Sequence, residues 1–381
     1  MRSLVETYSA SSCVTDSAAA ASAWGIGERI TNGVINITPD GRKPKTLHQK
    51  LQTIGHRTGL VSTASITHAT PAGFVATVKS RGEEANIAEQ YLDHGVDVLL
   101  GGGSRYFDEG LRKKFTSSGY AFADDLRSLE KLQHNQAKPL LGLFSSGHMP
   151  YEIDRLNDSK LTASTPSLAA MTSTALQTLQ SMSGGFFLVV EGARIDHAGH
   201  ANDAAASIHD QLAFDDAIGV ALDFIDKKPN TLLIVTTDHG CGGIQMNGVS
   251  SRPNEKFGPG SYAASNAHFD RIQGFRQSFE WMKQNGVAGL SGDKLTAAFK
   301  KYTGLEITKE QMPLVQGLRS GTGTAIFQHT GINWTSRNHT SELVEFCAIG
   351  PGSSQFPALM KNTEAHGILV DTLGIHGKSP A

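Results

Sequence analysis

Two groups of carboxylate and imidazole residues follow apolar stretches of the sequence. Asp196 and His200 come after the run that Glu191 closes, in VVEGARIDHAGH, and Asp238 and His239 come directly after LLIVTT. The four-residue spacing of Asp196 and His200 places both side chains on one face of a helical turn. A carboxylate beside an imidazole is a good ligand pair for zinc. These groups therefore predict a metal site.

A third group contains His339, which precedes the apolar stretch ELVEFCAIGPG. Taken singly, these signals are weak. A lone histidine before a strand is more often structural or solvated, and an Asp-His pair or a polar loop is common. However, all three groups lie at the carboxyl ends of expected strands or beside one, where open α/β sheets collect their active sites. Three such groups in one chain favour a multinuclear metal centre.

Ser17 lies in CVTDSAAAASAW, near the start of the chain. The simple structural interpretation is that Asp16 or Ser17 is the N-cap of an alanine-rich helix over residues 18–23. The same geometry suits a nucleophile that meets phosphate, because backbone N–H groups and the positive end of the helix dipole stabilise an anion there. No GxSxG sequence surrounds Ser17. We therefore expect a metal ion to activate its hydroxyl.

Arg81 is the candidate for binding phosphate, since a guanidinium can donate two parallel N–H bonds to phosphate oxygens. It lies in STASITHATPAGFVATVKSRGEE. This stretch predicts a helix with Thr70 as N-cap and Pro71 in its first turn, ending near Arg81. His68 and Thr70 stand at the exit of the preceding strand, where either could serve a metal. For Arg81 alone, a surface charge is the simpler interpretation.

Apolar runs alternate with helix-period segments along the chain. The expected strands lie within residues 59–69, 96–103, 139–145, 184–192, 231–240 and 342–352, and the clearest helices within 166–180 and 208–226. Nearly continuous apolar strands suit a sheet covered on both faces. We therefore predict a three-layer α/β/α sandwich with a central, mostly parallel sheet. Residues 250–330 do not continue this alternation of apolar strands and helices. They are expected to be an insertion in a single domain over residues 1–381.

Composition excludes several classes of protein. The formal net charge is −2 and 18% of the residues are charged, so no basic patch for nucleic acid or anionic membrane is indicated. No apolar run approaches the ~18 residues that span a bilayer, and MRSLVETYSA lacks the apolar core of a signal peptide. Cys13, Cys241 and Cys347 fit neither a disulfide framework nor a CxxC zinc pattern.

The order and spacing of several motifs resemble those of the alkaline phosphatases. The motifs are VTDSAAAASAW, STASITHATPAGFVATVKSR, VDVLLGGGSRYF, FFLVVEGARIDHAGHAN, LLIVTTDHGCGG and NHTSELVEFCAIGPGS. The resemblance covers Val14 to about Phe356, apart from residues 250–330. It implies a phosphate monoesterase with two zinc ions, one magnesium ion and a covalent phosphoserine. It also implies a homodimer and a periplasmic or secreted location.

The same resemblance implies roles for the matching residues. Ser17 is the expected nucleophile, and Arg81 the expected clamp on the non-bridging phosphate oxygens. Asp196, His200 and His339 match the ligands of the first zinc, which stabilises the leaving oxygen and later activates water. In a two-metal mechanism of this kind, the ions stabilise the attacking and the leaving oxygen of an in-line displacement.

The second zinc and the magnesium have their own matching residues. Asp238 and His239 match the ligands of the second zinc, which would also bind Ser17 and lower the pKa of its hydroxyl. Thr70 and Glu191 match ligands of the magnesium site. Carboxylate and hydroxyl oxygens are ligands that magnesium prefers.

Two positions depart from the pattern of the family. His68 stands where some members have aspartate near the third metal, and His197 stands where some have lysine or tryptophan near the phosphate. An imidazole at His68 lowers the negative charge of the third site. We therefore expect weaker magnesium binding and a preference for zinc there.

The largest departure precedes Ser17. Family members have an N-terminal strand that ends in a GDG-type aspartate bridging the second zinc and the magnesium. Here the only carboxylates before Ser17 are Glu6 and Asp16, and MRSLVETYSASSC contains no apolar strand followed by such a motif. We expect one central strand and one metal ligand to be absent, and weak zinc binding and turnover as a result.

Two other functions remain open at this point. One is a related phosphodiesterase or sulfatase, although Cys13 lacks the local motif of a sulfatase nucleophile. The other is an N-terminally incomplete, weakly active or inactive family member that acts as a binding protein. Metal analysis and assays on monoesters and diesters distinguish these possibilities.

Overall fold

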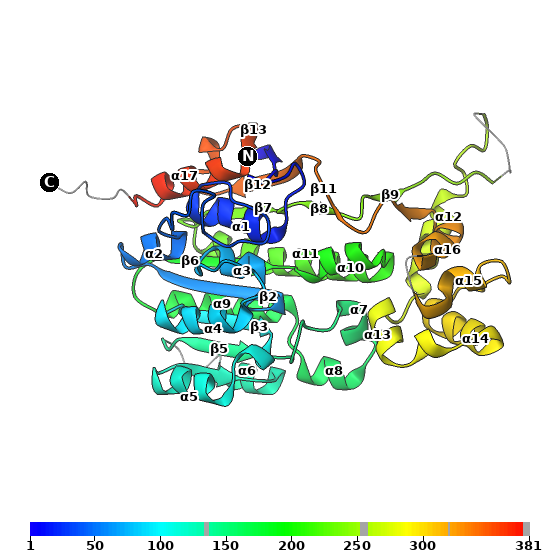
Figure 1. The fold of residues 1–381 in the computed structure, drawn as a ribbon, viewed down its shortest axis with the longest axis horizontal. Helices are drawn as coiled ribbons and strands as arrows, with labels where there is room; N and C mark the ends of the chain where they lie inside the picture. Colours follow the sequence, from blue (N-terminus) through cyan, green and yellow to red (C-terminus); the bar gives the residue numbers. More distant parts are fainter. Residues whose placement is uncertain (133–136, 252–257, 319–320, 376–381) are drawn as a thin grey trace.

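The strands form two main sheets. The computed structural model describes residues 1–132, 137–251, 258–318 and 321–375. One sheet has five strands in the order β4-β5-β3-β2-β6, and the other has four in the order β13-β1-β12-β7 (Figure 1). The strands are β1 Arg2–Glu6, β2 Arg57–Ser65, β3 Val98–Gly102, β4 Ala121–Ala123, β5 Leu140–Leu143, β6 Phe186–Glu191, β7 Leu233–Thr236, β12 Val344–Ile349 and β13 Leu359–Lys361. Short pairs are formed by β8 Gly240–Cys241 with β11 His339–Thr340 and by β9 Ile244–Met246 with β10 Ile332–Trp334.

The five-stranded sheet is parallel, as predicted, and the four-stranded sheet is mixed. All ladders of the five-stranded sheet are parallel, and β1 is parallel to β13. β12 is antiparallel to both β1 and β7. Five of the six predicted apolar stretches contain one of these strands, and the first, 59–69, overlaps β2, which begins two residues earlier.

β1 was not expected from the sequence. Its residues alternate between exposed and buried, with Ser3 and Val5 facing the interior. Because only alternate side chains are buried, the segment RSLVE has no continuous apolar run. The strand lies between β12 and β13, at a distance in sheet order from β6.

Helices cover both faces of the sheets. They are α1 Ser17–Ile26, α2 Leu47–Gln52, α3 Ala69–Gly73, α4 Glu84–Asp93, α5 Glu109–Ser117, α6 Leu126–Leu132, α7 Glu152–Leu156, α8 Ser159–Ser164, α9 Leu168–Ser181, α10 Arg194–Ala201, α11 Ala204–Lys227 and α17 Asn362–Thr372. Neighbouring residues of β2 point to opposite faces: Leu60 packs in a core with α1, α3 and α4, and Val61 packs in a core with α9. The predicted three-layer α/β/α architecture is therefore confirmed.

The two predicted helices begin at polar caps. α9 begins after Ser167, whose hydroxyl accepts a hydrogen bond from Ala170 N. α11 begins earlier than expected, because Asp203 caps it and accepts from Ala206 N. No helix in the described part of the chain is long and apolar enough to cross a bilayer.

Residues between β9 and β10 contain their own group of helices, on the right in Figure 1. They are α12 Ser265–Phe269, α13 Phe279–Gln284, α14 Gly292–Thr303, α15 Met312–Val315 and α16 Gly321–Thr330. Their apolar cluster includes Phe275, Phe279 and Phe299, together with Ala198 of α10 and Ala205 of α11. The segment thus packs against the helices that follow β6. That it is an insertion in a single domain stays a prediction.

Candidate metal and phosphate site

Ser17 is the first residue of α1. Asp16 is the N-cap: its extended backbone precedes the helix and its Oδ1 accepts a 3.0 Å hydrogen bond from Ala19 N. The Ser17 side chain is buried, and its Oγ lies 2.9 Å from Nε2 of His239. The hydroxyl thus stands at the positive end of a buried helix, where an anion is stabilised.

Asp196, His200 and His339 come together although His339 is far away in the sequence. Asp196 and His200 lie one turn apart on α10, and His339 begins β11. The Asp196 carboxylate lies 3.4 Å from Nε2 of each histidine. Together with Cys241, these residues offer ligand atoms that all lie within 4.8 Å of one another. The structure therefore assembles the set that was predicted for the first zinc.

The hydrogen bonds of the two histidines indicate that this set fits a cation. Nδ1 of His200 lies 2.6 Å from Arg337 O, and Nδ1 of His339 lies 2.8 Å from Thr15 O. A carbonyl only accepts, so each Nδ1 must carry the proton. Both Nε2 atoms then present lone pairs to each other across 3.1 Å. A cation shared by them would remove this repulsion, and histidine ligands of metals are usually oriented by such carbonyl bonds.

The carboxylate of Asp196 supports the same interpretation. Its Oδ1 is buried without a hydrogen-bond partner. Although burial opposes ionisation, the neighbouring imidazole rings of His200 and His339 hold the pKa of Asp196 well below its ordinary value. An ionised carboxylate with an unsatisfied buried oxygen is a costly arrangement unless a cation binds it.

Asp238 and His239 lie just beyond the end of β7, where both side chains can face one cavity. His239 Nε2 lies 3.1 Å from Asp238 Oδ2, and its ring stacks on that of His339 with centroids 3.6 Å apart. Burial lowers the pKa of His239, but the charge of Asp238 outweighs it and raises the value to about 9. The second predicted ligand pair therefore adjoins both Ser17 and the first set.

Glu191 and Thr70 form an oxygen-rich part of the same region. Glu191 ends β6, and its Oε2 accepts a 2.6 Å hydrogen bond from Ser62 Oγ. Burial raises the pKa of Glu191 to about 7, while hydrogen bonds from Ser62 and Thr70 oppose the rise. Since a buried carboxyl group with hydroxyl neighbours suits a hard cation, these residues fit the predicted magnesium ligands.

Arg81 reaches the site from a loop, which corrects the sequence prediction. The helix α3 spans only Ala69–Gly73 and its N-cap is His68, not Thr70. It ends early because the following chain pairs with a distant segment, in a bridge between Val78 and Ile35. The Arg81 guanidinium is then held by Asp16 Oδ2 at 3.1 Å and by His68 Nε2 at 3.0 Å.

Three histidine rings cluster around His68, which contacts Arg81, and the sequence indicated only two of them. His68 and His197 contact each other and His148, with ring centroids 4.4 to 5.5 Å apart. Burial, together with Arg81, lowers the pKa of His68 to about 3; burial, together with Arg194, lowers that of His197 to about 2. Both rings are therefore neutral and can donate hydrogen bonds without adding charge.

Arg194 and His148 had no sequence signal. Arg194 is 1% exposed and lies over the Tyr151 ring, 3.6 Å from its centroid. It donates to His197 Nδ1 at 2.8 Å and to Glu280 of α13 at 2.6 Å. The segment between β9 and β10 thus contacts the histidine cluster through one buried guanidinium.

Cys241 was also missed, because its spacing fits no cysteine motif. It lies in β8 directly opposite His339 of β11, and its side chain packs on Gly199 of α10. Burial and the nearby Asp196 raise the pKa of its thiol. Only the pairing of two distant segments brings this sulfur to the ligand set.

Zinc is expected to protect Cys241 from alkylation. A zinc ion bound by Asp196, His200 and His339 would lie next to the sulfur and shield or bind it. We expect the rate of iodoacetamide labelling at Cys241, followed by mass spectrometry, to fall at least about tenfold when zinc is added. Cys13 is exposed and gives an internal control, whose rate should not change. Equal slowing at both cysteines, or none at Cys241, would count against this location of the ion.

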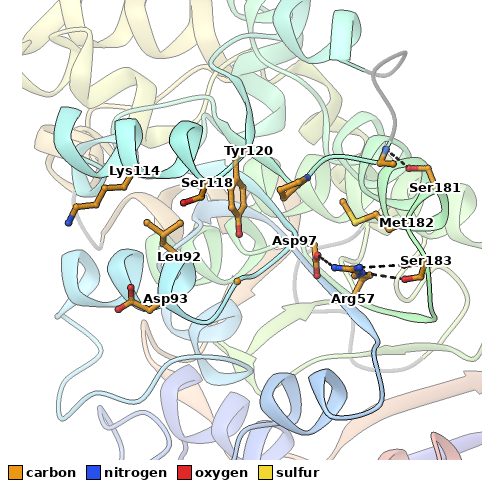
Figure 2. Close-up of a pocket in the computed structure, with 13 residues that line it drawn as sticks. Arg57, Leu92, Asp93, Asp97, Lys114, Ser118, Tyr120, Ser181, Met182 and Ser183 are labelled. Carbon is orange, nitrogen blue, oxygen red and sulfur yellow. Dashed lines mark hydrogen bonds and ion pairs between the residues drawn. The ribbon is translucent and has the colours of Figure 1, made fainter.

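Two cavities lie at opposite ends of the strands. The larger, about 1180 Å³, is lined by Ser17, Thr70, Glu191, Asp196, Asp238, His239 and Cys241 among others. A second cavity of about 760 Å³ lies where β2, β3 and β5 begin, around the 3.2 Å ion pair of Arg57 and Asp97 (Figure 2). None of the predicted site residues lines the second cavity. The candidate chemistry is therefore confined to the carboxyl ends of the strands, as expected.

Comparisons with known proteins agree with this site. The family model "Alkaline phosphatase" matches residues 1–375. Alkaline phosphatase 4 of Bacillus subtilis (strain 168) is 34% identical over 378 residues, which cover 94% of this chain and 77% of that protein. Alkaline phosphatase 3 of the same organism is 35% identical over 371 residues, which cover 92% of this chain and 75% of that protein.

Solved structures give the same result. The alkaline phosphatase of Thermus thermophilus superposes with a TM-score of 0.88 at 32% identity, covering 100% of this chain and 84% of that chain. A cold-active alkaline phosphatase from Shewanella sp. superposes with a TM-score of 0.84 at 29% identity, covering 97% and 89%. The chain therefore belongs to the alkaline phosphatase family of phosphomonoester hydrolases.

Proposed function

We propose that the chain hydrolyses phosphate monoesters through a covalent phosphoserine on Ser17, at a centre for two zinc ions and one magnesium ion. The observation that carries this proposal is the position of Ser17 Oγ. It lies at the N-terminus of α1, 2.9 Å from His239 of one candidate ligand set, and His239 stacks on His339 of the other. When bound, the metal ions would supply positive charge to both the attacking and the leaving oxygen.

The protein side chains supply the nucleophile and orient the phosphate. In the first half-reaction the Ser17 Oγ forms a bond to phosphorus as the ester P–O bond breaks and the alcohol leaves. Arg81 orients the phosphate oxygens, and Asp16 and His68 hold its guanidinium in place. In the second half-reaction water attacks phosphorus, the Ser17 Oγ leaves, and inorganic phosphate is released.

Substrate comparison with and without chelator tests this function. We expect hydrolysis of an aryl phosphate monoester, and its loss on removal of metal with recovery when zinc and magnesium return. Activity on a diester alone would instead support the phosphodiesterase hypothesis. A well-folded chain that binds no metal and hydrolyses neither substrate would support the binding-protein hypothesis. The expectation of weak turnover stays a prediction, and the same assay measures it.

The third metal site gives a separate prediction at His68. A mutant of the alkaline phosphatase from the Antarctic bacterium TAB5, in which a histidine is replaced by aspartate, is described with Mg bound in its M3 site; its structure superposes with a TM-score of 0.72 at 26% identity. We expect His68→Asp to increase the activation by magnesium about tenfold, because a carboxylate adds negative charge beside Thr70 and Glu191. Activity is measured against magnesium concentration at fixed zinc. An unchanged magnesium response would refute the assignment of His68 to this site.

The substrates, oligomeric state and location of the enzyme are proposed from its resemblance to the alkaline phosphatases. We propose small phosphate monoesters as substrates, a homodimer, and a periplasmic or secreted location, with no role for nucleic acid. Size-exclusion chromatography with light scattering tests the dimer.

A further inference from the structure

His200 has the most exposed side chain among the candidate ligands of the two zinc sets. Its side chain is 40% exposed, whereas that of His339 is 13% and that of His239 is 1% exposed. Ser17 lies on the closed side of the site, because it is buried and its Oγ is 2.9 Å from Nε2 of His239. In an in-line displacement the leaving oxygen stands opposite the nucleophile. The alcohol of a bound monoester therefore points away from Ser17, and the open side at His200 gives it access to solvent.

Arg337 contacts His200 with both its main chain and its side chain. Its carbonyl oxygen lies 2.6 Å from Nδ1 of His200, and its Nε donates a 2.7 Å hydrogen bond to the carbonyl oxygen of the same histidine. Arg337 is exposed and lies between β10 and β11. Within the described part of the chain, its two terminal nitrogens have no hydrogen-bond or ion-pair partner. The guanidinium thus offers donors to solvent next to His200.

Lys283 of α13 is a second cation at this place. Burial and the charge of Arg337 lower the pKa of Lys283, while the charges of Asp203 and Glu280 oppose the change. The two cations are therefore close enough to repel each other. Both acids already have other partners: Asp203 accepts hydrogen bonds from two backbone N–H groups, and Glu280 binds Arg194 at 2.6 Å.

Each cation also has a simple structural role. Arg337 binds a carbonyl at the C-terminal end of α10, and Lys283 lies in the last turn of α13, where positive charge complements the helix dipole. These roles do not require the two charges to lie close together, however, and neighbouring like charges are destabilising. An anion bound by both would remove the repulsion. Their proximity at the open side of the site therefore favours a negatively charged group there.

We propose that Arg337 and Lys283 form a subsite for the alcohol of the substrate, so that the preferred substrates are phosphate monoesters whose alcohol carries a second negative charge. A guanidinium can bind such a group through two parallel N–H bonds, and an ammonium adds a further charge. The proposal rests on the proposed function and names its substrate class. The bonds that form and break are those of the proposed reaction, and the leaving alcohol retains its anionic group.

Binding of phosphonates to the full chain, loaded with zinc and magnesium, tests the proposal without turnover, because their P–C bond is not hydrolysed. The probes are 3- and 4-carboxybenzylphosphonate, and the comparison ligands are the corresponding carboxamides, which have a similar shape and an uncharged ring substituent. Calorimetry gives each Kd, and we define the preference as the Kd of the amide divided by that of the carboxylate. We expect a preference of about tenfold for at least one isomer, because two exposed ion pairs each contribute a factor of a few. It should fall as ionic strength rises.

Two variants separate the charge from the positioning of His200. Arg337→Gln removes both a charge and the side-chain contact with His200, whereas Lys283→Gln removes a charge from a residue that has no hydrogen bond to His200 among those of the described chain. Each substitution should lower the preference about threefold. Lys294→Gln is the matched control, because Lys294 is an exposed lysine of α14. Its preference should equal that of the unchanged chain.

The outcomes distinguish this inference from the proposed function. A preference near one in the unchanged chain, or a preference that neither substitution lowers, would overturn the inference alone. So would an equal fall in the Lys294 variant, which would indicate a general effect of surface charge. Weaker binding of both ligands by the Arg337 variant, with no change in preference, would show that Arg337 only positions His200. Failure of both ligands to bind would refute the phosphate site, and with it both the proposed function and the inference.

Discussion

Replacement of Ser17 with alanine is expected to lower kcat for an aryl phosphate by on the order of 10³-fold or more. The reason is that the Ser17 hydroxyl lies at the N-terminus of α1, 2.9 Å from Nε2 of His239, and alanine has no group that can replace it. Loss of a nucleophile removes an entire covalent step, while the binding of phosphate by Arg81 is retained. Steady-state rates give kcat and KM separately, and KM should change little.

Covalent labelling with phosphate tests the role of Ser17 directly. Acid-quenched protein incubated with labelled phosphate should contain covalent phosphate on a peptide that includes Ser17, and the alanine variant should not. The control is Ser12→Ala, which removes a nearby hydroxyl that accepts only from Val14 N. Normal turnover by the Ser17 variant, or labelling on another peptide, would rule out Ser17 as the nucleophile.

Replacement of Asp196 with asparagine is expected to weaken zinc binding by more than about 100-fold, since even partners of metal ligands contribute 10–100-fold. Among the residues that the structure describes, Asp196 is the carboxylate that groups with both His200 and His339, at 3.4 Å from each Nε2. The amide keeps the size of the side chain but removes its negative charge. Activity should fall with the metal content.

Elemental analysis after dialysis measures the metal directly. We expect the variant to retain less zinc than the unchanged chain, with a normal far-UV circular dichroism spectrum. Asp215→Asn is the matched control, because Asp215 is an exposed acid of α11. Zinc retention by the Asp196 variant equal to that of the control would show that the ion is held elsewhere.

The strands and most site residues could be predicted because their signals are local. A strand covered on both faces is apolar at most positions, so β3 and β6 are visible as runs of sequence. Asp196 and His200 are visible as a pair because a single helical turn connects them. Such features do not depend on what the rest of the chain does.

The features that the sequence did not predict depend instead on contacts that form only in the folded chain. Thr70 was assigned as a helix cap, but the helix that follows is shortened by the pairing of Val78 with Ile35. Cys241 joins the ligand set only because β8 pairs with β11. Arg194 is buried because Tyr151, His197 and Glu280 surround it. None of these partners is adjacent in sequence.

The sequence alone thus determined the class of fold, the residue types of the site and the elements that carry them. Only the tertiary structure decided which nitrogen of each histidine faces the site, how Arg81 is held and how the strands divide into two sheets. The physical reason is that propensity and burial act along a segment, whereas hydrogen-bond direction and the pairing of strand edges depend on partners that folding brings from elsewhere.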